Sequence, residues 1–160
     1  MTPAYKAFLT EELPALFRTL PEDTEPNFGL MTAHHAVEHL IYVTKSMVKR
    51  RGEPSGEPTK SQLYFRNFID KGAPFKHNPR EGVTKENLAP LRSATIEEAT
   101  KGLEAASAQF YSLFDTNPDY KSYNEMMGEF NLSELEIFMY QHGRWHAYQF
   151  GLIEEFTPIV

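Results

Sequence analysis

The residues of this chain best suited to chemistry are two histidines four positions apart, His142 and His146. In a helix this spacing places both imidazoles on one face, one turn apart. On a helical wheel they lie near the middle of a largely apolar stripe that also contains Leu135, Phe138, Met139, Trp145, Gln149 and Ile153. Buried imidazole nitrogens need polar partners, and two at this spacing can bind one divalent cation. The alternative is a pair of core histidines, each hydrogen-bonded to a neighbouring group.

A second group of histidines lies earlier in the chain, in another segment with helical periodicity. On the wheel His39 and His34 lie at opposite edges of an apolar stripe, and His35 points further outward. A third ligand from this segment would complete a three-histidine site with open coordination positions, which is the pattern of a catalytic metal. We predict His39 as that ligand, with His35 as a candidate fourth ligand or as a partner of a ligand.

Three more polar residues lie near these histidines or in the loops. Glu38 is expected to be a solvated helix residue; the alternatives are that it orients a ligand or acts as a general base. Gln149, one turn past His146, either hydrogen-bonds a ligand histidine or satisfies another buried polar group. His77 is expected to be exposed in an irregular connector.

The composition excludes several kinds of site. The 160 residues include no cysteine, which excludes disulfides, a thiol nucleophile and zinc sites with thiolate ligands. The chain has no glycine-rich phosphate loop and no Gly-x-Ser-x-Gly turn, so nucleotide and serine-hydrolase chemistry have no support. A net charge of −6 argues against nucleic acid as the main partner. A metal site here therefore depends on histidine, with carboxylate or water as further ligands.

Four segments carry the helical periodicity that would position these residues. They span residues 4–20, 32–51, 95–114 and 133–150. Pro14 is expected to kink or divide the first helix. Thr32 and Gly52 are expected to begin and end the second. Four basic residues gather near the end of the second helix: Lys45, Lys49, Arg50 and Arg51. We expect them to make favourable contact with the negative end of the helix dipole, and an anion site is the alternative.

Capping signals mark the last two helices. Thr95 with Glu98, and Ser133 with Glu136, fit the Ser/Thr-x-x-Glu capping box. Gly151 fits a helix stop.

The connector between the second and third helices, residues 52–94, is long. It begins with a Pro/Gly-rich stretch, continues with a short predicted helix at 61–70, and looks irregular over 72–90. The aromatic residues Tyr64, Phe65 and Phe68 are expected to pack over the end of the helices, or alternatively to line an apolar pocket above the metal. A long irregular connector in a compact domain is often functional.

These elements predict an all-α fold, a four-helix bundle forming one domain over residues 1–160. Strand signals are weak, because no run of alternating β-branched residues appears. The long connector can carry the chain along the whole bundle and leave helices two and three parallel. With neither a leader pattern nor a membrane-spanning apolar run, we expect a soluble, cytoplasmic protein.

The histidine motifs resemble those of the DinB/YfiT-like superfamily. The matching residues are Glu38-His39-Leu40 and His142-Gly-Arg-Trp-His146-Ala-Tyr-Gln149-Phe-Gly-Leu152. The Gln-Phe-Gly-Leu ending is similar to that of a bacterial subgroup of uncharacterised members. The family often has an acidic residue just before its last histidine pair, whereas this chain has none obviously placed there and carries Arg144 and Trp145 between the two histidines.

The resemblance implies an up-down-down-up bundle, often a homodimer. It also implies a divalent metal, typically zinc or nickel, held by His39, His142 and His146. Characterised relatives include transferases and isomerases that use a low-molecular-weight thiol. The resulting hypothesis is a metal-dependent enzyme acting on a small molecule, such as a thiol-dependent S-transferase, with metal-assisted hydrolysis as the second chemistry. A non-catalytic bundle that binds a small ligand or a protein is the alternative.

Overall fold

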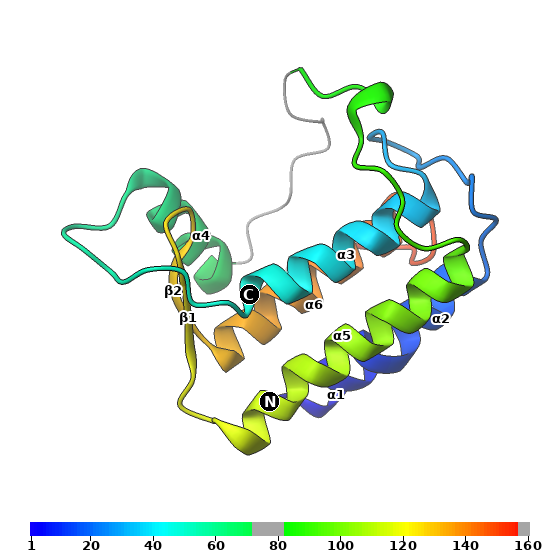
Figure 1. Ribbon diagram of the computed structural model, residues 1–160. Helices are drawn as coiled ribbons and strands as arrows, with labels where there is room; N and C mark the ends of the chain where they lie inside the picture. The colour runs from blue at the N-terminus through cyan, green and yellow to red at the C-terminus, as the bar shows by residue number, and fades with distance from the viewer. Residues whose placement is uncertain (72–81, 157–160) are drawn as a thin grey trace.

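A computed structural model describes residues 1–71 and 82–156 and shows a mostly helical chain with one small two-stranded sheet (Figure 1). Helix α3 packs against α5, α5 also packs against α2, and α6 contacts both α2 and α3. The bounds of these long elements and of the helical run at the start of the chain are α1 (Pro3–Ala7), η1 (Phe8–Glu12), α2 (Leu13–Arg18), α3 (Ala33–Met47), α5 (Ile96–Thr116) and α6 (Leu132–Gln149). Their apolar faces form one continuous core.

The first helical run changes its winding before Pro14 instead of breaking there. Element η1 is a π-helix, in which the Leu13 N–H donates to the Phe8 carbonyl five residues back. In an α-helix, proline cannot donate an N–H and its ring collides with the carbonyl four residues back. In this chain a wider π-helical turn directly precedes Pro14. The predicted division at Pro14 therefore takes the form of a change in helix type.

Helix α3 begins as predicted but ends four residues early. Thr32 accepts a hydrogen bond from the His35 N–H and caps the start. The helix ends at Met47, because the chain beyond it pairs with strand β1 (Lys121–Asn124): the Arg51 N–H donates to the Tyr123 carbonyl at 2.7 Å.

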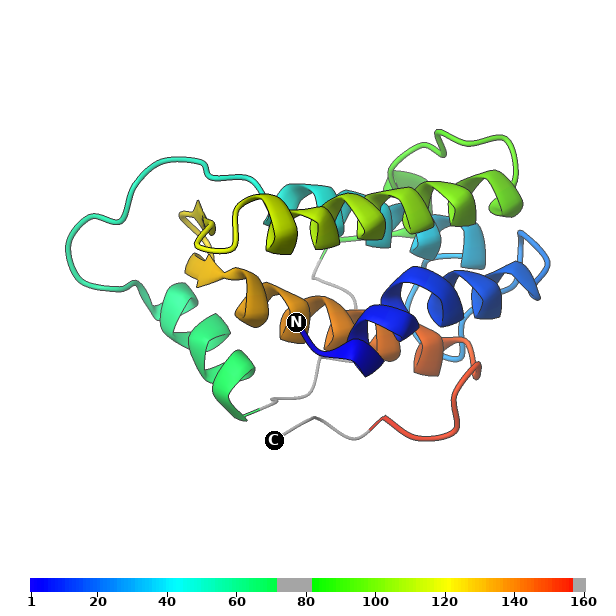
Figure 2. The ribbon, with the colours of Figure 1, turned by 90° about the horizontal axis from the view of Figure 1, so that it is seen from below.

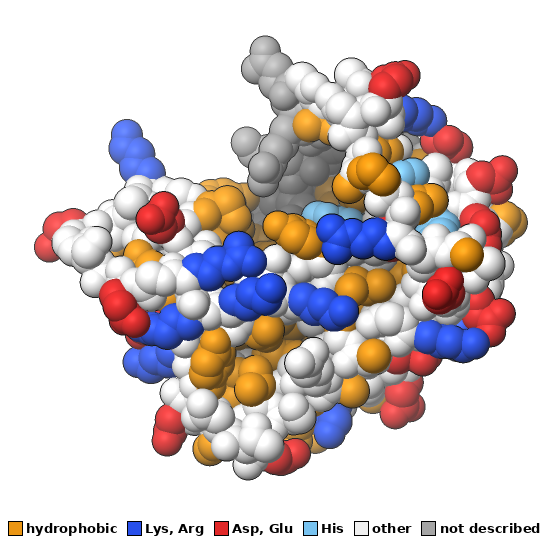
Figure 3. Space-filling view, in the orientation of Figure 1, with side chains coloured by type: hydrophobic (Ala, Val, Ile, Leu, Met, Phe, Trp, Pro, Cys, Tyr) orange, Lys and Arg blue, Asp and Glu red, His pale blue; other side chains and the backbone are white. Residues whose placement is uncertain are grey.

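Most of the basic cluster expected at the end of this helix lies beyond it, because α3 ends at Met47. Lys45 alone lies in the last turn of α3. The Arg50 guanidinium binds the carboxylates of Glu53 and Glu129 and so ties the linker to the sheet. Lysine and arginine side chains gather on the face shown in Figure 3. Lys45 is therefore the residue of this cluster that is placed to interact favourably with the helix dipole. Arg50 already has two carboxylate partners and gives no support to an anion site.

The start of α5 confirms one of the two hydrogen bonds of the predicted capping box, and the start of α6 shows that the box predicted there was wrong. Thr95 accepts from the Glu98 N–H, although the Glu98 carboxylate reaches the Ala94 N–H and not that of Thr95 itself. The capping box of α6 is formed by Asn131 and Glu134, two residues before the predicted pair. Asparagine serves this position as well as serine, so the pattern alone did not separate the two registers.

The predicted box residue Glu136 has another role. It is buried on α6, and its carboxylate accepts a hydrogen bond from the Thr2 backbone N–H, at 2.9 and 3.1 Å from its two oxygens. At the other end of α6, Gly151 ends the helix as predicted, with φ +66°. The Gly151 and Leu152 N–H groups bond the carbonyls of Tyr148 and Ala147, which is the Schellman arrangement.

The two-stranded sheet was not expected from the sequence. Strands β1 and β2 (Gly128–Asn131) pair antiparallel, with Lys121 opposite Asn131 and Asn124 opposite Gly128. Each strand has four residues, too few to show a clear alternation. Gly128 adopts φ +88° at the turn, and the Met127 N–H is bound by the Asn124 side chain. The connector before α6 is therefore a hairpin.

Helix α4 (Lys60–Lys71) confirms the short helix predicted at 61–70. Figure 2 shows it beside the N-terminal half of α6 and apart from α5. Arg66 binds the Glu129 carbonyl and the Glu134 carboxylate and lies over the Phe130 ring. The rings of Phe65 and Phe68 contact Phe138 of α6, as in the packing interpretation, while Tyr64 is exposed.

The described part of the connector also contains the 3-10 helix η2 (Lys85–Asn87). His77 and most of the stretch expected to be irregular fall outside the described residues. Within residues 1–71 and 82–156, none of the helices combines the length and apolar character that crossing a bilayer requires.

Candidate metal centre

Three histidines from two helices meet between α3 and α6. The Nε2 atom of His142 lies 3.3 Å from Nε2 of His39 and 3.1 Å from Nε2 of His146. One nitrogen from each ring lies within 4.8 Å of the other two. These are the three residues that the sequence pattern and the family resemblance selected, and the structure brings their side chains together.

The three imidazole rings are steeply inclined to one another. His39 meets His142 at an interplanar angle of 78° and His146 at 69°, and His142 meets His146 at 73°. The Nε2 separations show that the nitrogens converge, and the steep angles show that no two of these rings stack face to face. Imidazoles that share a tetrahedral cation approach it from separate directions, which rings stacked face to face could not do. On its other side, the His142 ring stacks on Phe138, with centroids 5.6 Å apart.

Burial keeps the two α6 histidines neutral. His142 is 8% exposed and His146 is 4% exposed, whereas His39 is half-buried. Burial, and then the nearby His146 and His39 rings, holds the pKa of His142 well below its usual value. Burial and the His39 ring lower the pKa of His146 to about 3, against a smaller upward effect from Gln149. Neutral imidazole has the lone pair that a metal ligand needs.

Gln149 connects His146 to the loop before α3. Its Oε1 lies 2.8 Å from Nδ1 of His146, and its Nε2 donates to the Phe28 carbonyl at 2.6 Å. The sequence left two roles open for Gln149, and the structure shows both, a contact to a candidate ligand and the satisfaction of a second buried polar group. The neighbouring Gly29 has φ +91°, a conformation that favours glycine.

Neither of the other two histidines on α3 joins the cluster. Nδ1 of His35 lies 2.8 Å from the Thr32 hydroxyl, at the cap of the helix. Nε2 of His34 lies 2.8 Å from the Ser93 hydroxyl. The suggestion that His35 adds a fourth ligand is not supported by these contacts.

Glu38 is not the solvated residue that the sequence suggested. Its carboxylate accepts hydrogen bonds from the Arg92 N–H, the Ser93 N–H and the Ser93 hydroxyl, at 2.6 to 3.0 Å. Burial acts to raise its pKa, but the bonds from Ser93 and Arg92 prevail and lower it. Glu38 therefore fastens the end of the long connector to α3, next to His39 in the chain.

The two residues between the α6 histidines contact the C-terminal segment. Arg144 donates to the Glu155 carbonyl at 3.1 Å, and Trp145 packs against Phe28 and Phe156. Trp145 thus supports the same loop residue whose carbonyl binds Gln149. Sequence spacing gave no signal for Phe28 or Gly29, since neither lies on a predicted helix and no motif contains them.

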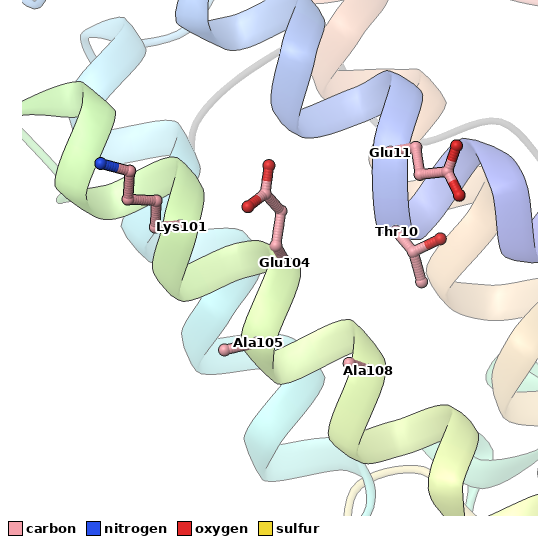
Figure 4. A pocket seen from close by; sticks show the side chains of 6 residues that line it. All are labelled: Thr10, Glu11, Lys101, Glu104, Ala105 and Ala108. Atoms are coloured by element: carbon pink, nitrogen blue, oxygen red, sulfur yellow. The ribbon is translucent and has the colours of Figure 1, made fainter.

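An open groove of about 660 Å³ lies elsewhere, between η1 and α5. Figure 4 shows Thr10 and Glu11 across from Glu104, Ala105 and Ala108, with Lys101 at one end. Glu104 is already paired with Arg18 at 2.6 Å, and Lys101 with Glu97 at 2.8 Å. None of the three clustered histidines lines this groove, so it offers no chemistry comparable to theirs.

Comparison of the chain with protein-family models, with curated proteins and with solved structures finds no match. The geometry and chemistry of the histidine cluster are therefore the basis for inferring a function.

Proposed function

We propose that this protein is a metal-dependent enzyme that holds one divalent cation, zinc or nickel, on His39, His142 and His146. The observation that carries the proposal is the convergence of three imidazole nitrogens within 4.8 Å in a largely buried site. Three imidazole nitrogens, two of them from rings that burial keeps neutral, form a typical donor set for these metals. The four-residue spacing on α6 and the third ring from α3 supply the ligands from rigid elements, which favours a defined geometry.

Three protein ligands leave a coordination position for a substrate or for water. A divalent ion bound here would lower the pKa of a coordinated thiol or water and supply a nucleophile near neutral pH. The chain has no cysteine, so a thiol at this position would come from a small cosubstrate. We propose a thiol-dependent S-transferase on this basis and from the DinB-like motifs, with metal-assisted hydrolysis as the second candidate.

The packing of the helices supports the finer architectural proposal. The run from α1 to α2, together with α3, α5 and α6, would form the four-helix bundle of a DinB-like domain, in up-down-down-up order, with α4 as an addition in the connector. A cytoplasmic homodimer that acts on a small molecule and binds neither nucleic acid nor membrane completes the proposal.

Metal content of the purified protein tests the proposal. After loading with zinc or nickel and removal of excess ion, we expect about one ion per chain, and a His142→Ala, His146→Ala double variant should bind none. His35→Gln is the matched control, because His35 is a histidine beside the site whose ring bonds Thr32 instead. A folded wild-type protein that takes up neither zinc nor nickel contradicts the proposal. The histidines would then be core residues that hydrogen-bond to neighbouring groups.

A thiol-transfer screen follows if the ion binds. Each of several low-molecular-weight thiols would be offered with a panel of electrophiles to the metal-loaded protein and to the double variant. Transfer by the loaded wild type alone supports the S-transferase; hydrolysis of ester or amide substrates without thiol supports the second candidate.

A further inference from the structure

The hydrogen bonds around Gln149 fix which way its side-chain amide points. The Phe28 backbone carbonyl can only accept, and it lies 2.6 Å from one end of the amide. That end must therefore be the NH₂ group. The oxygen at the other end then faces His146, at 2.8 Å from Nδ1.

The amide orientation in turn fixes the proton on His146. An amide oxygen accepts only, so Nδ1 of His146 must carry the hydrogen of this bond. A neutral imidazole has one N–H, and its other nitrogen, Nε2, is left with the lone pair. This is the nitrogen that lies 3.1 Å from Nε2 of His142, within the cluster.

We propose that the Phe28 carbonyl, acting through Gln149, holds His146 as the Nδ1–H tautomer with Nε2 presented to the cluster, and that Gly29 provides the space this requires. Phe28, Gly29 and Gln149 are thus positioning residues. The tautomer follows from the hydrogen bonds of Gln149, whereas its effect on an ion rests on the proposed function.

Gly29 is required because of a close approach to the Gln149 amide. A Cβ atom at position 29 would lie 2.4 Å from Nε2 of Gln149, and the backbone there has φ +91°. A side chain at this position would displace the amide from both of its partners. The Asn27 N–H also donates to the Gln149 carbonyl at 2.9 Å, so the loop is fastened to this residue by backbone as well as side chain.

A second contact keeps the Phe28 carbonyl in place. The centroid of the Phe28 ring lies 5.0 Å from that of Trp145. Trp145 lies on α6, the helix that carries His142 and His146. The loop before α3 and the end of α6 therefore form one unit around Gln149. Groups that hold a ligand histidine in one tautomer raise metal affinity, and their loss costs about 10- to 100-fold.

The tautomer can be read without any metal. Two-bond ¹H–¹⁵N correlation spectra of the metal-free protein distinguish a protonated from an unprotonated Nδ1, and the His146→Gln variant assigns the signals. We expect His146 to be fully in the Nδ1–H form near neutral pH. A wild-type His146 in the Nε2–H form, or in a mixture of the two, overturns the proposal whether or not the protein binds an ion.

Three variants test the hydrogen bonds that lead from the Phe28 carbonyl through Gln149 to His146. Gln149→Met keeps the volume but removes both polar ends, and it should release His146 into a mixture of tautomers. Gln149→Glu keeps an acceptor at Nδ1 and should retain the Nδ1–H form. Gly29→Ala should act like Gln149→Met, since the added methyl displaces the amide. If Gln149→Met leaves His146 fully in the Nδ1–H form, or if Gly29→Ala leaves the tautomer of His146 unchanged, the proposed positioning of His146 is wrong.

Gly52→Ala is the matched control for Gly29→Ala. Gly52 has the same φ of +91°, but a Cβ there would meet only the Tyr123 ring, at an ordinary 3.6 Å. It therefore carries the backbone strain without the collision, and it should leave the tautomer unchanged.

Metal affinity supplies the second readout. In a wild type that binds zinc, Gln149→Met and Gly29→Ala should weaken binding about 10- to 100-fold, and Gln149→Glu and Gly52→Ala should weaken it less. Unchanged affinity in Gln149→Met overturns the positioning role. A wild type with the expected tautomer but no metal binding defeats the proposed function and leaves the tautomer assignment standing.

Discussion

The Nε2 atoms of His39 and His142 lie 3.3 Å apart, although 103 residues separate them in the chain. His39 comes from α3 and His142 from α6, so the contact exists only when these helices pack together. It brings the half-buried His39 against the buried His142.

His39→Ala should abolish tight metal binding while leaving the fold intact. It removes the ligand supplied by α3, and two histidines on one helix turn cannot hold the ion with the same affinity, so we expect a loss of more than about 100-fold. Competition with a chromophoric chelator measures the affinity. His34→Ala is the comparison, because His34 contacts Ser93 outside the cluster; equal losses in both variants would contradict the assignment of His39.

Glu38→Ala should lower stability without removing a ligand. The substitution leaves the Arg92 and Ser93 groups that now bond the carboxylate without their acceptor, which should cost about 1–3 kcal/mol in the free energy of unfolding. Urea denaturation measures the cost. Metal stoichiometry should stay that of the wild type, and a metal-loaded variant that is fully stable but catalytically dead would instead favour the general-base interpretation.

Gly143→Ala should destabilise the protein through a collision between helices. A Cβ at this position, between the two histidines of α6, would lie 2.7 Å from Cδ2 of the buried Leu13. Overpacking of this kind costs about 1–3 kcal/mol, which urea denaturation can resolve. Gly102→Ala on α5 is the matched control. Its Cβ would meet only the end of the Ile41 side chain at 3.1 Å, and alanine favours the helix, so it should be neutral or stabilising.

The ion pair between Arg50 and Glu129 should make stability depend on pH. The Arg50 hydrogen bond is the main cause that lowers the pKa of Glu129 below its usual 4.5. A lowered folded pKa means that the stabilisation is present above pH 4.5 and is lost as the pH falls through the folded value. Arg50→Gln should reduce this loss, by roughly 0.5 kcal/mol for a partly exposed pair. Urea midpoints at about pH 6 and about pH 3.5 test this, and an identical pH dependence in Arg50→Gln and wild type would contradict it.

Features that depend on neighbours within one or two helical turns were predictable from the sequence. The four-residue spacing of His142 and His146 places them on one face of any helix that contains them. Thr32 and Gly151 mark their helix ends by contacts with residues a few positions away. The same local logic did not distinguish the Asn131 box from the predicted one at Ser133, since both residues suit the position.

Only the tertiary structure decided which polar groups meet across the chain. His34 and His39 occupy opposite edges of one helical stripe, and the packing of α3 against α6 selects His39 for the cluster. Glu38 finds its partners 54 and 55 residues away, and Gln149 finds the Phe28 carbonyl 121 residues away. Helical periodicity is a property of a short stretch of backbone and states which side chains share a face. What that face meets depends on how distant segments pack, which local spacing does not contain.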